Sequence, residues 1–237
     1  MSEQHIVDAA CITEKSEITM RTKTKNEIRA LMDPYVQILN QCGATFLSPV
    51  WSVKEIMGKV YSSQKQIHFQ EFVEGIAYHF ANNSMDKSDV EALVKKVSDS
   101  TNHETMTSIL DSVFFSHCKI SRTILGIITG KLMRYDKLDY EDMVLVNALR
   151  NLFDDDLSEF WRYTNHQPTH PIEKVVFLDH CTETDRLIVE KLQNAGVLGR
   201  DLTGNRLGGA MLRFEPTIIT ERLKSYLDAI SPAFVDL

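Results

Sequence analysis

The longest stretch of helical hydrophobic periodicity in this chain runs from Thr101 to Arg134. Apolar residues recur there at steps of three and four, which is the spacing of a helix face that must be covered. Thr101 and Glu104 have the spacing of a capping box, which predicts where the helix begins. A shallow break between Ser116 and Ser121 is where the stretch would divide into two helices. We expect the other helices to pack around this stretch.

Two glycines in this stretch, Gly126 and Gly130, lie four residues apart and therefore on one helix face. Because glycine has no Cβ, it allows another backbone to come close. Ile124, Ile127 and Ile128 surround both glycines and leave little of that turn for solvent. The uncharged run is too short to cross a bilayer, so we expect close packing between helices and not a membrane dimer motif.

Helical periodicity on both sides of this stretch predicts further helices at residues 26–42, 52–80, 88–97, 140–153, 155–163, 182–196 and 217–230. The pattern over 52–80 fits either two helices or one long helix. Ser88 and Glu91 form a capping-box pair that predicts the start of the next helix. In the later helices the periodicity places Met143, Phe153 and Leu187 on the buried faces.

Acidic residues mark the starts of two predicted helices. Asp139 and Asp142 precede and begin the helix at 140–153, and the triplet 154–156 begins the helix after it. Negative charge is favourable at a helix N-terminus because it complements the helix dipole. We expect the triplet to be a solvated face and not a cation site.

The C-terminal part of the chain adds a small amount of β-structure. The run at 174–178 is rich in β-branched and aromatic residues, and the glycine-rich segment from Val197 to Phe214 predicts a β-hairpin. Two prolines in the segment at 165–171 predict a linker. We therefore divide the chain into a loosely ordered leader at 1–24, a helical domain at 25–136 and a second domain at 137–237.

The order of predicted elements in the second domain is that of a winged helix-turn-helix: three helices followed by a hairpin. The sequence thus predicts a mostly α-helical protein, a multi-helix bundle with a C-terminal winged-helix-like unit that contains a small β-hairpin. Arg200, Arg206 and Arg213 of the expected wing are the candidate nucleic-acid-binding residues. Glu183 and Asp185 at the start of the preceding helix would oppose contact with DNA.

Three segments resemble a group of prokaryotic helical proteins. These are ILDSVFFSHCKISRTILGIITGKLM, MVLVNALRNLFDDDLSEFWRYT and LIVEKLQNAGVL. The resemblance as a whole covers about the C-terminal two thirds of the chain. The group includes the abortive-infection alpha type of phage-defence proteins. The resemblance rests on apolar spacing and implies a setting of phage–host conflict. It carries over no site residues.

Charge and cysteine content narrow the function classes. The chain has 26 Lys and Arg against 33 Asp and Glu, a net charge of -7, which disfavours nucleic acid as a general partner. The four cysteines are far apart and form no CxxC pair, as in a reduced intracellular protein. The N-terminus lacks the pattern of a secretory signal and no run could span a membrane. We expect a cytoplasmic protein.

The candidate chemistry is limited to one group of residues, His166, His170, Asp179 and His180. A metal site would need three or four of them to converge, and no HExxH or CxxC motif supports one. His117 and Cys118 are adjacent in the chain and point in different directions, so they do not form a nucleophile pair. We therefore predict no catalytic residue, no metal ligand and no cofactor.

The sequence favours a non-enzymatic protein-interaction or regulatory protein, because several helices have apolar faces and few residues could carry chemistry. A protein partner is expected, and a homo-oligomer is compatible with this interpretation. Two alternatives remain open: a DNA-binding transcriptional regulator that uses the winged helix, and a metal-dependent enzyme that uses the histidine group.

Overall fold

The computed structural model describes residues 63–98, 103–166, 176–178, 182–200 and 212–234, together with positions 30 and 33. The described chain is mostly helical and has one small sheet, as predicted. Its helices are α3 (Ser63–Asn82), α4 (Lys87–Ser98), α5 (His103–Phe115), α6 (Lys119–Tyr135), α7 (Tyr140–Leu149), α8 (Asp154–His166), α9 (Glu183–Asn194) and α10 (Ile218–Phe234). Its strands are β1 (Val176–Leu178), β2 (Leu198–Arg200) and β3 (Leu212–Pro216).

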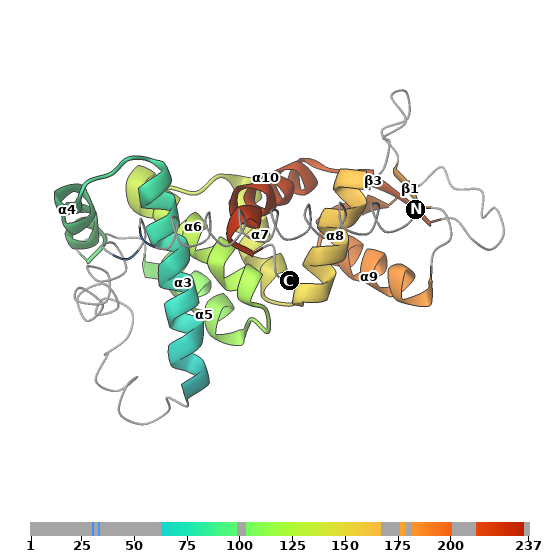
Figure 1. Ribbon diagram of the computed structural model, residues 1–237, viewed down its shortest axis with the longest axis horizontal. Coiled ribbons are helices and arrows are strands. Elements are labelled where there is room, and N and C mark those ends of the chain that lie inside the picture. The colour runs from blue at the N-terminus through green and yellow to red at the C-terminus, as the bar shows by residue number, and fades with distance from the viewer. Residues whose placement is uncertain are drawn as a thin grey trace, which may run out of the picture.

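The elements lie along one long axis (Figure 1). Helices α3, α4 and α5 lie at one end, α9 and the strands lie at the other, and α7 and α10 lie between them. Helix α6 contacts α3, α4, α5, α7 and α8. Every residue from Ile120 to Gly130 is buried, including the polar Ser121, Arg122 and Thr123. The predicted stretch does divide, because α5 ends at Phe115 and α6 begins at Lys119.

Helices α3 and α6 form the most extensive helix contact, and glycines lie at its centre. A Cβ placed on Gly126 would lie 2.1 Å from the carbonyl oxygen of Phe72 and 2.9 Å from Cα of Gly75. A Cβ on Gly75 would lie 2.1 Å from the carbonyl oxygen of Thr123. The two backbones therefore touch at these positions. A Cβ on Gly130 would instead meet the ring of His79 at 2.8 Å, which is a side-chain contact.

His79 is buried in this contact, and its Nε2 atom has no hydrogen-bond partner among the described residues. Burial lowers the pKa of His79 from 6.5 to about 4, helped by the positive charges of Arg134 and Lys131. The neutral ring is thus the form that the fold accommodates.

We predict that the protein loses stability as the pH falls from about 6.5 to 4. In that window the unfolded chain binds a proton on His79 and the folded chain does not, so unfolding becomes easier by about 1.4 kcal/mol per pH unit. The total loss is roughly 3 kcal/mol. Denaturant melts across this range should show a shallower pH slope for His79→Met. Parallel slopes for the two proteins would contradict the assignment to His79.

The residue that caps α4 lies two positions before the predicted one. Asp86 and Asp89 form the reciprocal pair: the amide of Asp89 donates to Oδ1 of Asp86 at 2.9 Å, and the amide of Asp86 donates to Oδ2 of Asp89 at 3.2 Å. Ser88, predicted as the cap, donates its hydroxyl to Asp86. The prediction of Ser88 and Glu91 was wrong because a carboxylate at 86 accepts both the amide and the hydroxyl.

The three strands form an antiparallel sheet in the order β1-β3-β2. The run at 174–178 was predicted as a strand, and β2 and β3 are the two arms of the predicted hairpin. Strand β1 lies between α8 and α9 in the chain. These two helices are therefore not joined by the short turn of a helix-turn-helix motif. A short turn of that kind, residues 150–153, does join helices α7 and α8.

Three residues predicted as buried are exposed: Met143, Phe153 and Leu187. Helix α7 ends at Leu149, and the turn that follows resets the helical phase before Phe153. On α9 the buried face is that of Ile188 and its neighbours, one residue past Leu187. The predicted leader at 1–24 and the helix at 26–42 lie outside the described residues, apart from positions 30 and 33. The predicted start of the linker, at residue 165, is too early because α8 continues through His166.

Candidate interaction surface

A group of buried and half-buried ionisable side chains connects α6, α7 and α10. Asp142 is fully buried and pairs with Lys131, and it accepts a hydrogen bond of 2.7 Å from the hydroxyl of Tyr226. Lys131 also donates to that hydroxyl at 3.2 Å, and Nε of Arg222 lies 3.7 Å from the Asp142 carboxylate. Burial and the neighbouring Asp142 raise the pKa of Tyr226 above its ordinary value. Each member has a partner, so we interpret the group as a structural joint.

A second buried contact connects the turn between α5 and α6 to the start of α8. The thiol of Cys118 donates to Oδ1 of Asp154 at 2.7 Å, and its sulfur accepts the amide of Ser121 at 3.2 Å. The amide of Ile120 also donates to Asp154, at 3.3 Å. Burial and the bond to Asp154 raise the pKa of Cys118 to about 12. The thiol is thus an N-cap of α6 and a poor nucleophile, because the thiolate is disfavoured.

The prediction that the acidic triplet at 154–156 is a solvated face is wrong for two of its three residues. Asp154 bonds to the α6 N-terminus. Asp156 is buried, accepts the amide of Phe153 at 2.7 Å and pairs with Lys191 of α9. Of the three acids, only Asp155 is exposed. The other two fix the turn before α8 against α6 and α9.

Two phenylalanines near these buried contacts are exposed, and a cationic side chain stacks on each ring. Phe115 is 58% exposed, and the guanidinium of Arg150 lies 4.7 Å from its ring centroid. Phe153 is 48% exposed; Nζ of Lys191 lies 3.8 Å from its centroid, and the ring of His117 lies 5.4 Å away. We call Phe115, His117, Arg150, Phe153 and Lys191 the aromatic patch. Its residues come from the end of α5, the turn 116–118, the turn 150–153 and helix α9.

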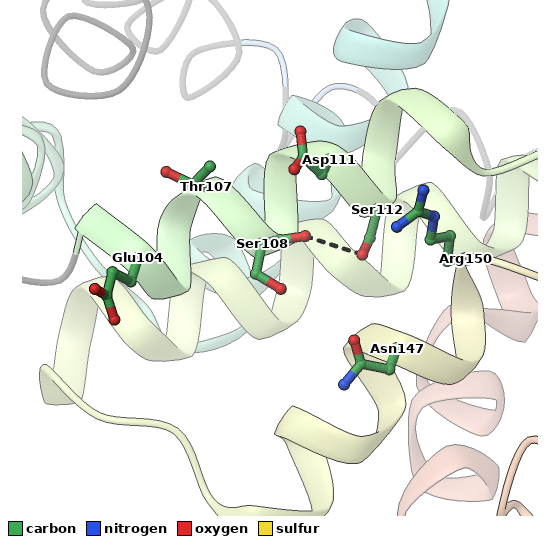
Figure 2. Close-up of a pocket in the computed structure, with 7 residues that line it drawn as sticks. All are labelled: Glu104, Thr107, Ser108, Asp111, Ser112, Asn147 and Arg150. Atoms are coloured by element: carbon green, nitrogen blue, oxygen red, sulfur yellow. Dashed lines mark hydrogen bonds between the residues drawn. The ribbon is translucent and has the colours of Figure 1, made fainter.

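A groove of about 420 Å³ adjoins the aromatic patch between α5 and α7 (Figure 2). The residues that line it come from two helices. Helix α5 contributes Glu104, Thr107, Ser108, Asp111 and Ser112; helix α7 contributes Asn147 and its C-cap, Arg150. Figure 2 shows Arg150 beside Ser112 at one end, Glu104 at the other end, and Asn147 facing α5 from below. We call this the polar groove. Arg150 belongs to both surfaces and joins them.

Of the three candidate nucleic-acid residues, Arg200 is the one whose side chain is described. Arg200 ends β2, is exposed and donates to the side chain of Asn194 at 2.7 Å. Arg213 lies in β3 opposite Phe177, and its side chain is outside the described part, as is all of Arg206. Asp185, expected to repel DNA, caps α9 through Thr182.

Of the histidine group, only the backbone of His166 is described, at the end of α8. His170, Asp179 and His180 lie outside the described residues. Within the described ranges, no group of three or more His, Cys, Asp and Glu side chains is arranged to hold a metal ion. The same ranges contain no helix that is both long and apolar enough to cross a membrane.

No protein-family model, curated protein or solved structure matches this chain. The surface must therefore be interpreted from its own geometry. Sequence reasoning missed Arg150 and Phe115, and it placed Phe153 on a buried face. A signal was present, since Phe115 stands directly before the predicted break and Arg150 three residues before Phe153. Only the approach of the two turns shows that these residues belong together.

Proposed function

We propose that this chain is a non-enzymatic protein-interaction protein and that the aromatic patch and the polar groove form its docking surface. The observation that carries the proposal is the pair of half-exposed phenylalanines, each covered by a cation. Aromatic residues and arginine are enriched at protein interfaces and dominate their binding energy. Burial of the two rings by a partner would remove apolar surface from water.

The patch is held in place by buried contacts, which supports a binding role. Cys118 and Asp154 fix the two turns to each other, and Asp156 fixes Lys191 beside Phe153. Arg122 donates to the carbonyl of Ser116 at 2.8 Å, which fixes the turn after Phe115. A surface that is ordered before binding loses less conformational entropy when the partner arrives.

The finer features of the sequence interpretation stay within this proposal. A winged-helix-like unit at the C-terminus is supported by the antiparallel sheet beside α9 and by the short turn between α7 and α8. We propose that this unit serves protein contact and not DNA binding, since acids begin α9 and Arg200 bonds to Asn194. A role in phage–host conflict remains a proposal from the resemblance of the helical segments.

The test is affinity capture from the native host with matched variants. We expect the partner captured by the natural chain to be lost with Phe115→Ser combined with Phe153→Ser. The control is Tyr135→Ser, because Tyr135 is 54% exposed and is also stacked by an arginine, Arg134, at 5.2 Å. Tyr135 ends α6, at the opposite end of that helix from the patch. Retention of the same partner by the double variant, or its loss with Tyr135→Ser alone, would place the docking surface elsewhere.

A further inference from the structure

We propose that the polar groove binds an extended peptide segment of the partner that carries a carboxylate for Arg150 and a cation for Glu104. This inference rests on the proposed interaction function and specifies the chemistry of the partner. It follows from the charges at the two ends of the groove, from the hydroxyl and amide groups between them, and from the distance that separates the ends.

Arg150 is a guanidinium held ready for an anion. Its contact within the described part of the chain is the ring of Phe115, with no hydrogen bond or ion pair there. Arg122, Arg162 and Arg222 are instead paired with carboxylates. Stacking on a ring fixes the plane of a guanidinium while leaving its N–H groups free, and that planar fork matches a carboxylate or phosphate.

The groove itself selects a carboxylate over a phosphate. Glu104 and Asp111 line it together with Arg150, so its lining has two negative charges and one positive charge. A phosphate group carries nearly two negative charges and would be repelled by both acids. A nucleic-acid backbone carries one negative charge at every phosphate and offers no cation for Glu104, so both acids disfavour it as well. A single carboxylate at the Arg150 end, accompanied by a cation at the Glu104 end, complements both ends of the groove and brings no net negative charge to Asp111.

The lining between the ends fits an extended backbone. Ser108 and Asn147 present a hydroxyl and an amide group that can bond to exposed peptide N–H and C=O groups. A helical segment satisfies those groups internally, whereas an extended one presents them. Glu104 and Ser112, which lies beside Arg150, are eight residues apart on α5, or about 12 Å. In an extended segment, side chains four residues apart share a face and are separated by about 13 Å.

The experiment is selection of a displayed library of random 12-residue peptides on the intact chain. We expect enrichment of peptides with Asp or Glu four residues from Lys or Arg. A selected peptide should bind Arg150→Glu at least tenfold more weakly by fluorescence anisotropy and should bind Arg134→Glu unchanged. Arg134 is the matched control because it also stacks on an exposed ring. Circular dichroism would show that both variants are folded.

A charge exchange makes the test specific to the groove. A synthetic peptide with its acid and base interchanged should bind the double variant Arg150→Glu with Glu104→Lys and not the natural chain. Failure of this exchange, enrichment of peptides without an acid, or the absence of any enrichment would overturn the inference. If the Phe115 and Phe153 variants still lose the captured partner in that case, the interaction function stands and only the peptide chemistry is wrong.

Discussion

Replacing Gly126 with alanine is expected to lower the free energy of unfolding by about 3 kcal/mol. The added methyl group would lie 2.1 Å from the carbonyl oxygen of Phe72, and a backbone atom cannot move aside as a side chain can. Helices α3 and α6 would have to separate along their contact, which is an overpacking penalty at or above the upper end of the usual 1–3 kcal/mol. The gain in helix propensity, about 1 kcal/mol, offsets only part of it.

Gly130→Ala provides the comparison within the same helix. There the methyl group would meet the ring of His79, whose rotation can relieve part of the strain, so we expect a smaller loss. Thermal melts should show a decrease of roughly 6–12 °C for Gly126→Ala and less for Gly130→Ala. Gln70→Ala, on the exposed face of α3, controls for substitution alone. A melting temperature for Gly126→Ala at or above that of the natural protein would mean that α3 and α6 are not in backbone contact.

Replacing Asp142 with alanine is expected to have an effect of similar or larger size, about 3–5 kcal/mol. The substitution leaves the largely buried ammonium of Lys131 with only a longer pair, at 3.6 Å, to the half-exposed carboxylate of Asp139. It also removes the acceptor of the Tyr226 hydroxyl. A buried charge without its partner costs much more than the pair contributes when intact. Chemical denaturation should show the loss as a lower midpoint with an unchanged slope.

The double variant Asp142→Leu with Lys131→Met tests whether the loss of stability comes from the unpaired charge of Lys131. It removes both charges and fills their space with apolar atoms, so it should be more stable than Asp142→Ala. If the stability changes of Asp142→Leu and Lys131→Met add up to that of the double variant, Lys131 and Asp142 do not interact. The exposed Asp155→Ala is the control, since Asp155 is the acid of the triplet without a buried contact.

The role of Asp142 illustrates what the sequence could not supply. Its position in the first turn of α7 predicted an acid that complements the helix dipole. That position is correct, but its partner Tyr226 lies 84 residues further along the chain. No periodicity relates the two, so the sequence predicts the helix and not the burial. The same holds for Asp156, whose partner Lys191 is 35 residues away.

The glycine contact between α3 and α6, in contrast, is partly predictable from the sequence. Four-residue spacing within a run of isoleucines predicts a close helix contact at Gly126 and Gly130. The other half of that contact, Gly75, stands alone in α3 and carried no comparable signal. The aromatic patch was missed for a related reason. Hydrophobic periodicity assigns an apolar residue to the core, and it cannot show that a helix has already ended before Phe153.

The joint between α6, α7 and α10 has a consequence for the order in which the chain folds. Lys131 and Asp142 are made early, whereas Tyr226 follows Asp142 by 84 residues. At synthesis rates of 5–20 residues per second, that interval lasts roughly 4–17 s. Helices α3 to α7 therefore emerge long before the residue that completes their most buried carboxylate. Helix α10 closes the joint, so a ribosome paused before α10 would hold a chain in which Asp142 still lacks its bond to Tyr226.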